Sequence, residues 1–110
     1  MKFELKNAKK VERNGLKGWA YNTKEDFKNA SAFYFEIDGA HGMVKSTLND
    51  RVYFVIDGEG EFIINDEVIP VKKFDVIIVP KNTPYNYRGK MKCFLVHAPA
   101  FDPAFDIKLE

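Results

Sequence analysis

The chain has 110 residues, which is enough for one domain with its own hydrophobic core and too short for two. Apolar residues make up 45% of the chain and aromatic residues 15%, a globular composition that favours strands. The net charge is +1, so composition gives no electrostatic argument for nucleic acid or an anionic membrane as a partner.

The compartment is predicted from the cysteine count and the first residues. A single cysteine, Cys93, excludes an intrachain disulfide, as is usual in the reducing cytoplasm. The first ten residues, MKFELKNAKK, lack the apolar stretch of a signal peptide, and no apolar run is long enough to cross a bilayer. We therefore expect a cytoplasmic protein without a membrane partner.

The N-terminal part of the chain, residues 1–30, predicts strands with a turn at Asn14-Gly15. Only residues 22–30 carry a helix-like pattern, and a single turn or a loop fits them equally well. From residue 31 onward, short β-branched and aromatic runs alternate with turn signals, a spacing typical of a sandwich or barrel. These runs are SAFYFEI, RVYFVI, EFIIN, EVIPV, DVIIVP, PYNYR and KCFLVH.

Two hairpins are predicted in the middle of the chain, across Asp57-Gly58 and across Asn65-Asp66. With both turns, residues 51–79 form an antiparallel meander. The tail at 104–110 continues from PAFDP and is expected to return as an edge strand.

Two sets of spaced residues stand within residues 31–103. The first runs from Gly39 over five residues to Lys45-Ser46-Thr47, over three more to Arg51, and over six to Gly58. The second consists of Phe74, Pro80, Asn82, Tyr85 and Gly89. These spacings, and the segments GEGEF and VIIVPKNTPY, resemble the two motifs of the cupins, a family of small β-barrels. The resemblance implies an all-β fold, a single-domain cupin or double-stranded β-helix (jelly-roll) barrel spanning residues 1–110.

The first cupin motif reads Gly, five residues, His-x-His, three or four residues, Glu, six residues, Gly, and the second contains one further His. In metal-binding cupins these three His and the Glu hold the metal. The resemblance places Lys45, Thr47, Arg51 and Tyr85 at the four ligand positions. Lysine and arginine repel a divalent cation, and tyrosine would have to ionise far below its usual pKa. We therefore expect no metal and no cofactor, and none of the family's metal-dependent dioxygenase, isomerase or oxalate-cleaving activities.

Side chains alternate between the two faces of a strand, so the family register predicts which ones face into the barrel. The inward candidates are Lys45, Thr47, Arg51, Tyr53, Val55, Tyr85 and Tyr87. His97 shares a face with Cys93 and Leu95, and the sequence does not decide whether that face is the inner one. His41, in GAHGM, is predicted to be a solvent-exposed loop residue.

The main functional expectation is a metal-free cupin that binds a small, anionic metabolite in the barrel, because two cations and several hydroxyls suit a carboxylate or phosphate. The expected ligand-binding residues are Lys45, Thr47, Arg51, Tyr53, Tyr85, Tyr87 and His97. No residue is assigned a catalytic role in this reading.

Two alternatives remain open. One is a metal-independent isomerase or epimerase that acts through Tyr85 and His97, by analogy with sugar-nucleotide epimerases of the cupin-like fold. The other is a structural cupin without ligand, in which Lys45 and Arg51 reach water or pair with carboxylates. In each case we expect a homodimer, because short barrels leave edge strands that need a cover.

Overall fold

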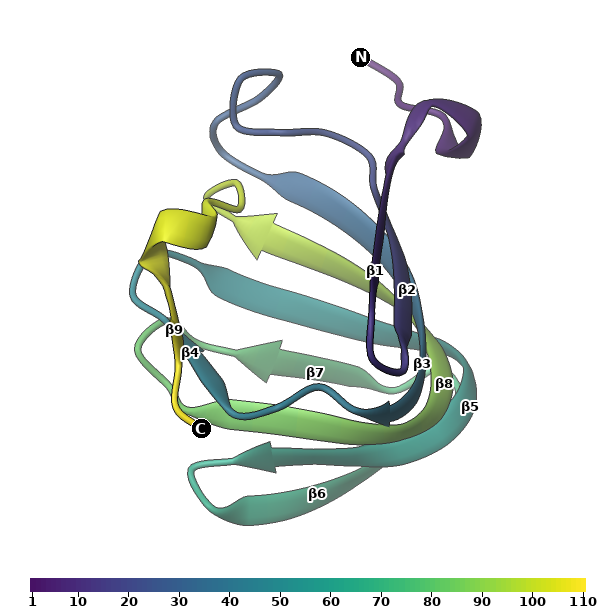
Figure 1. Cartoon of the computed structure of the whole chain (residues 1–110), viewed down its shortest axis with the longest axis vertical. Helices are drawn as coiled ribbons and strands as arrows, with labels where there is room; N and C mark the ends of the chain where they lie inside the picture. The colour runs from purple at the N-terminus through teal and green to yellow at the C-terminus, as the bar shows by residue number, and fades with distance from the viewer.

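The computed structural model describes all 110 residues and contains nine antiparallel strands in one sheet that curls on itself (Figure 1). The strands are β1 (Lys9–Arg13), β2 (Leu16–Ala20), β3 (Ser31–Ala40), β4 (Val44–Ser46), β5 (Asp50–Ile64), β6 (Glu67–Lys72), β7 (Val76–Val79), β8 (Tyr85–Ala98) and β9 (Asp106–Lys108). Two short 3-10 turns, η1 (Leu5–Asn7) and η2 (Pro103–Phe105), are the only helical segments. The all-β prediction is confirmed, and residues 22–30 form turns rather than a helix. None of the helical segments is long and apolar enough to span a membrane.

Strands β5 and β8 form the frame of the barrel. They pair with each other along almost their whole length, and Figure 1 shows both bending from one wall of the barrel to the other. β3 pairs with the free side of β8, whereas β6 and β7 pair with the two halves of β5. Because each long strand belongs to both walls, its inward side chains line the whole interior.

The predicted hairpin at Asp57-Gly58 is wrong, because β5 continues through it to residue 64. The register against β8 shifts between Val55 and Asp57, so the segment is a bulge that bends the strand. Gly58 has φ +84°, and a Cβ there would lie 2.2 Å from the Lys90 carbonyl oxygen. Asp57-Gly58 therefore allows β5 and β8 to approach each other closely. The second hairpin is confirmed at Asn65-Asp66, where both residues have positive φ.

Alternation along β5 and β8 determines which side chains face the interior. On β5, Tyr53 and Val55 are fully buried while Val52 and Phe54 face outward. On β8, every second residue from Tyr85 to His97 is buried, apart from Gly89 at the bend. The register that the sequence left open is therefore resolved: His97 faces inward together with Cys93 and Leu95. Burial also raises the pKa of the Cys93 thiol to about 12, which makes it unreactive at neutral pH.

The C-terminal tail closes one side of the barrel. It returns as β9, as expected, and pairs with β4 so that Asp106 lies opposite Ser46 and Ile107 opposite Lys45. This pairing brings the carboxylate of Asp106 to the interior, where the buried polar residues of β5 lie.

Candidate functional site

The centre of the site is Arg51, whose side chain is only 4% exposed. Its Nη1 donates to the Tyr85 hydroxyl at 2.8 Å, its Nε to Asn49 Oδ1 at 3.0 Å and its Nη2 to the Asp106 carboxylate at 2.5 Å. Burial alone would lower the pKa of Arg51, but Tyr85, Tyr53 and Asp106 together raise it above its ordinary value. Arg51 is therefore a permanently charged group whose three side-chain nitrogens each donate to a protein partner.

Two tyrosine hydroxyls extend this cluster into the barrel. The hydroxyl of Tyr53 lies 2.7 Å from that of Tyr85, and both side chains are 1% exposed. Burial raises the pKa of both phenols, so both stay protonated at neutral pH. The result is a continuous chain of hydrogen bonds from Asp106 through Arg51 and Tyr85 to Tyr53.

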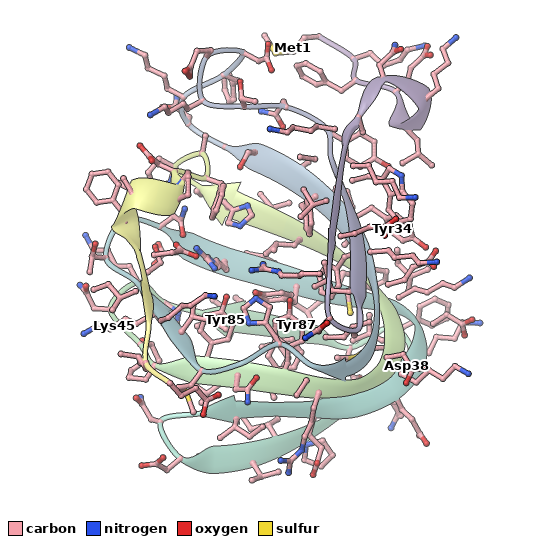
Figure 2. The ribbon with its side chains drawn as sticks, in the orientation of Figure 1. Met1, Tyr34, Asp38, Lys45, Tyr85 and Tyr87 are labelled. Atoms are coloured by element: carbon pink, nitrogen blue, oxygen red, sulfur yellow. The ribbon has the colours of Figure 1, made fainter.

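The predicted inward orientation of Lys45 and Thr47 is wrong. Val44 and Ser46 are the buried residues of this segment, whereas Lys45 is half-buried and Thr47 is exposed. The Thr47 hydroxyl donates to the Phe105 carbonyl at 3.2 Å, on the tail rather than in the barrel. In Figure 2, Lys45 lies at the edge where β4 meets β9, while Tyr85 and Tyr87 lie further inside. No second cation therefore faces Arg51 from β4.

The error comes from the motif spacing. Counting four residues before Arg51, instead of three, places the two histidine positions on Ser46 and Val44, and a shift of one residue reverses the face of a strand. Valine has no lone pair, Arg51 is a cation, and the pKa of Tyr85 is raised rather than lowered. The structure also contains no cluster of three His, Cys, Asp or Glu side chains that could hold a metal. This donor set does not fit a divalent cation.

His41 is the site residue that sequence reasoning missed. It was predicted to be exposed, but it is half-buried, and its ring stacks on Tyr87 with centroids 4.7 Å apart and planes at 22°. Its backbone N–H donates to the Tyr87 carbonyl at 2.8 Å. The signal that could have identified it is its position next to Gly42, whose φ of +101° turns the chain back onto β8.

The protonation of His41 follows from its contacts. Nδ1 lies 3.0 Å from the Gly42 carbonyl oxygen, which can only accept, so Nδ1 carries the proton and Nε2 keeps its lone pair. Burial lowers the pKa of His41 below its ordinary value, and the nearby cations Arg13 and Arg51 lower it further. His41 is therefore neutral at pH 7, with Nε2 available as a base.

Tyr87 completes the arrangement. It is 2% exposed and packs between the His41 ring, the Phe62 ring at 5.0 Å and the Tyr53 ring at 5.4 Å. Burial raises its pKa well above the ordinary value. The hydroxyls of Tyr53 and Tyr85 bond each other, but neither the Tyr87 hydroxyl nor His41 Nε2 has a hydrogen-bond partner in the chain. These two groups remain free to contact a ligand.

His97 faces the interior, but it does not join the tyrosines. Its Nδ1 lies 3.3 Å from the Ser31 hydroxyl, and its ring packs against Phe101 at 5.1 Å. Burial, reinforced by Arg51 opposite it on β5, lowers the pKa of His97 to about 3. The acid–base pair of Tyr85 and His97 is therefore not brought together by any hydrogen bond. Two surface hollows, around Glu36 and around Glu59, contain none of the site residues.

Solved structures with a similar fold include Pac13 from Streptomyces, described as a unique nucleoside dehydratase. It is 24% identical to this chain with a TM-score of 0.92, and the match covers all of this chain and 91% of that one. Variants of Pac13 with a histidine changed to glutamine, or either of two tyrosines changed to phenylalanine, have been solved with uridine. A protein from Planctomyces limnophilus is 21% identical with a TM-score of 0.83, over 96% of this chain and 94% of that one. At such identities the likeness shows the fold alone.

Oxalate decarboxylase from Bacillus subtilis is 16% identical with a TM-score of 0.85, over 97% of this chain but only 31% of that longer one. No curated protein matches the sequence. A family model described as a cupin domain matches residues 40–97, which is just over half of the chain and includes β4, β5 and most of β8. With this match and a curled antiparallel sheet in common with its structural neighbours, the chain belongs to the cupin family.

Proposed function

We propose that this cupin is metal-free, binds a nucleoside in its barrel, and removes water from it with His41 as the general base. The observation that carries the proposal is the stack of His41 on Tyr87, which presents two polar groups, Nε2 and a hydroxyl, that have no hydrogen-bond partner in the chain. Neither atom is among the fully buried unpaired side-chain atoms, so both can be reached by a ligand, which must offer an acceptor to the hydroxyl and a donor to Nε2. A ligand with several hydroxyls or carbonyls meets that requirement.

The residues replaced in the uridine-bound Pac13 variants have counterparts at similar spacing in this chain. These counterparts support the choice of His41, Tyr53 and Tyr87 as the ligand-contacting residues. Those two tyrosines are 34 positions apart, as are Tyr53 and Tyr87. The replaced histidine precedes the first of them by 13 positions, and His41 precedes Tyr53 by 12. Since the two folds match over this whole chain, His41, Tyr53 and Tyr87 are the natural counterparts.

Dehydration suits this arrangement of side chains. The reaction breaks a C–H and a C–O bond, forms a carbon–carbon double bond, and releases water, so it needs a base for the proton and an acid for the leaving hydroxyl. His41 Nε2 takes the proton from carbon and returns it to the hydroxyl, which leaves as water. Tyr53 and Tyr87 keep their phenol protons because their pKa values are raised, and they orient the ligand as hydrogen-bond donors.

Arg51 has a supporting role in this proposal. It occupies a position where the family has a metal ligand, and it places the Tyr85 hydroxyl against that of Tyr53. Because Asp106 already neutralises Arg51 and Lys45 does not face it, the geometry favours an uncharged ligand over the anionic metabolite expected from the sequence.

The test is calorimetric titration of the protein with uridine, followed by mass spectrometry of nucleosides incubated with it. We expect binding that His41→Gln and Tyr87→Phe both weaken, and a product lighter by one water that His41→Gln does not form. His97→Gln, the matched histidine variant, should bind as the wild type does. Absence of binding for uridine and the other common nucleosides, or equal binding by all variants, would contradict the proposal.

The metal-free part of the proposal has its own test. Elemental analysis of protein purified without a chelator or a metal-binding tag should find well below one transition metal per chain. One equivalent of zinc, iron, manganese or nickel that survives gel filtration would show that our reading of the donor set is wrong.

A further inference from the structure

The loop between β3 and β4, residues 41–43, is fixed to β8 on one side. The His41 N–H donates to the Tyr87 carbonyl at 2.8 Å, and the Gly42 N–H donates to Asn86 Oδ1 at 2.8 Å. These bonds hold the His41 ring in its stack on Tyr87. The imidazole itself bonds only to the Gly42 carbonyl, so the proton on the ring is controlled from the loop and not from β8.

The C-terminal tail lies along the other side of this loop. β9 pairs with β4 so that Lys108 lies opposite Val44, and Figure 1 shows the C-terminal end of the chain beside the start of β4. The pairing continues past β9, where the Leu109 N–H donates to the Met43 carbonyl at 3.0 Å. The side chain of Glu110 then accepts the Met43 N–H through Oε1 at 2.6 Å. A short bond of this kind is typical of a carboxylate acceptor.

A single peptide group connects Glu110 with the imidazole of His41. The Gly42 carbonyl and the Met43 N–H belong to the same peptide, which is planar and conjugated, so a charge at one end polarises the other. The Glu110 carboxylate accepts from the N–H end at 2.6 Å, and His41 Nδ1 donates to the carbonyl end at 3.0 Å. Hydrogen bonds in such a series strengthen one another, because each polarises the next. The series therefore runs from a carboxylate to the ring whose Nε2 is free.

We propose that Glu110 is a positioning residue for His41: through the Gly42–Met43 peptide it keeps the proton on Nδ1 and stabilises the positive charge that the ring acquires when Nε2 takes a proton. The inference rests on the proposed function, in which His41 is the base. A carboxylate that bonds an imidazole directly fixes its tautomer and stabilises the imidazolium in the same way. Here a peptide group stands between the two, so the effect is smaller.

Other charged groups act on His41 from the neighbouring strands. Arg13 on β1 and Arg51 on β5 disfavour a positive charge on the imidazole, whereas Asp106 on β9 favours it. Asp106 forms an ion pair with Arg51, so the two fields oppose each other at His41. The phenols of β8 that lie against the ring are neutral. Glu110 forms no ion pair, and it reaches the imidazole through hydrogen bonds.

The experiment is a pH titration of the imidazole nitrogen signals by NMR, on the full chain without ligand. Glu110→Gln keeps an oxygen that can accept the Met43 N–H but removes the charge, so the loop should keep its place. We expect the midpoint of the His41 titration to fall by about 0.3 to 0.6 pH unit, the effect of one charge at roughly 7 Å near the surface, and the Nε2–H tautomer to gain population. Glu67→Gln, exposed on β6, is the matched control and should change neither.

An unchanged midpoint in Glu110→Gln, or an equal change in Glu67→Gln, would overturn the proposal, because a carboxylate that only holds the loop would leave the proton on His41 undisturbed. Dehydration gives a second readout: Glu110→Gln should lower the turnover rate by about threefold to tenfold, while the dissociation constant for uridine stays within about twofold of wild type. A shifted midpoint in a protein that neither binds nor dehydrates a nucleoside would contradict the proposed function and still support the link between Glu110 and His41.

Discussion

Arg51 and His41 both carry nitrogen-containing side chains toward the same barrel, but they differ in what their partners leave free. The Arg51 guanidinium donates to an amide, a phenol and a carboxylate, so it is held in one place. The His41 ring donates once, from Nδ1 to a carbonyl, and stacks on Tyr87, so Nε2 stays free. The difference teaches that two polar clusters in one barrel can be suited to different tasks. In one polar cluster the donors are paired within the protein, and in the other Nε2 of His41 has no partner in the chain.

The strongest test of that comparison is His41→Gln. It should lower the rate of dehydration by about 10² to 10⁴, the usual contribution of a general base, while unfolding free energy changes by less than about 1 kcal/mol. Since burial lowers the pKa of His41 below 6.5, the wild-type rate should be level around pH 7 and fall only at pH values below that lowered pKa. A rate–pH profile measured by product mass would show both effects, and a glutamine variant that turns over normally would exclude His41 as the base.

Arg51→Met should be mainly a stability variant. Removing the guanidinium leaves the Asp106 carboxylate, the Asn49 amide and the Tyr85 hydroxyl without their donors, a loss of about 3–5 kcal/mol. Urea unfolding of Arg51→Met and Lys45→Met, measured side by side, gives the loss in free energy of unfolding for each variant. Lys45→Met should stay within about 0.5 kcal/mol of wild type. If the two variants lost the same stability, Arg51 would not be the structural centre of the site.

His97 predicts how stability depends on pH. Its folded pKa is about 3 and its unfolded pKa is near 6.5, so between these values only the unfolded chain takes up the proton. Stability should therefore fall as pH drops below 6.5, by up to about 1.4 kcal/mol per pH unit. Denaturation of wild type and His97→Gln at pH 7 and pH 5 checks this. The smaller shift of His41 acts in the same direction, so the glutamine variant should keep only a shallow dependence, and an unchanged slope would contradict the assignment.

The smallest expected effects come from two variants that each remove one tyrosine hydroxyl. One hydroxyl belongs to the Arg51 cluster and the other to the His41 stack. Tyr85→Phe removes a hydroxyl that bonds both Arg51 and Tyr53, and should cost about 1–2 kcal/mol. Tyr87→Phe removes a hydroxyl without a partner in the chain and should leave stability within about 0.5 kcal/mol, while it weakens uridine binding. Thermal unfolding with and without uridine measures both, and the reverse order of stabilities would mean that the hydroxyls are paired differently.

Much of the fold could be predicted because its signals are local. The alternation of Arg51, Tyr53 and Val55 on one strand, and of Tyr85 and Tyr87 on another, placed these side chains inside the barrel, where the structure has them. The β4 segment was mispredicted because the motif allows two spacings, and one residue decides whether Lys45 or Ser46 faces inward.

The rest of the site depends on contacts between distant parts of the chain. Asp106 reaches Arg51 only because β9 pairs with β4, and the residues around Asp106 carry no sign of that partner. His41 is half-buried because its loop folds back onto Tyr87 in β8, while its sequence context, Gly39-Ala40-His41-Gly42, is typical of an exposed turn. The homodimer and the cytoplasmic location remain predictions.

The most direct test of the central claim uses the fact that the chain has only two histidines. A long-range ¹H–¹⁵N spectrum of the imidazole nitrogens resolves both rings and reports their tautomers. We predict that His41 is neutral with its proton on Nδ1 at pH 7, and that uridine shifts its Nε2 signal while the signals of His97 stay in place. A spectrum in which saturating uridine leaves His41 unchanged, or in which His97 alone responds, would contradict the account.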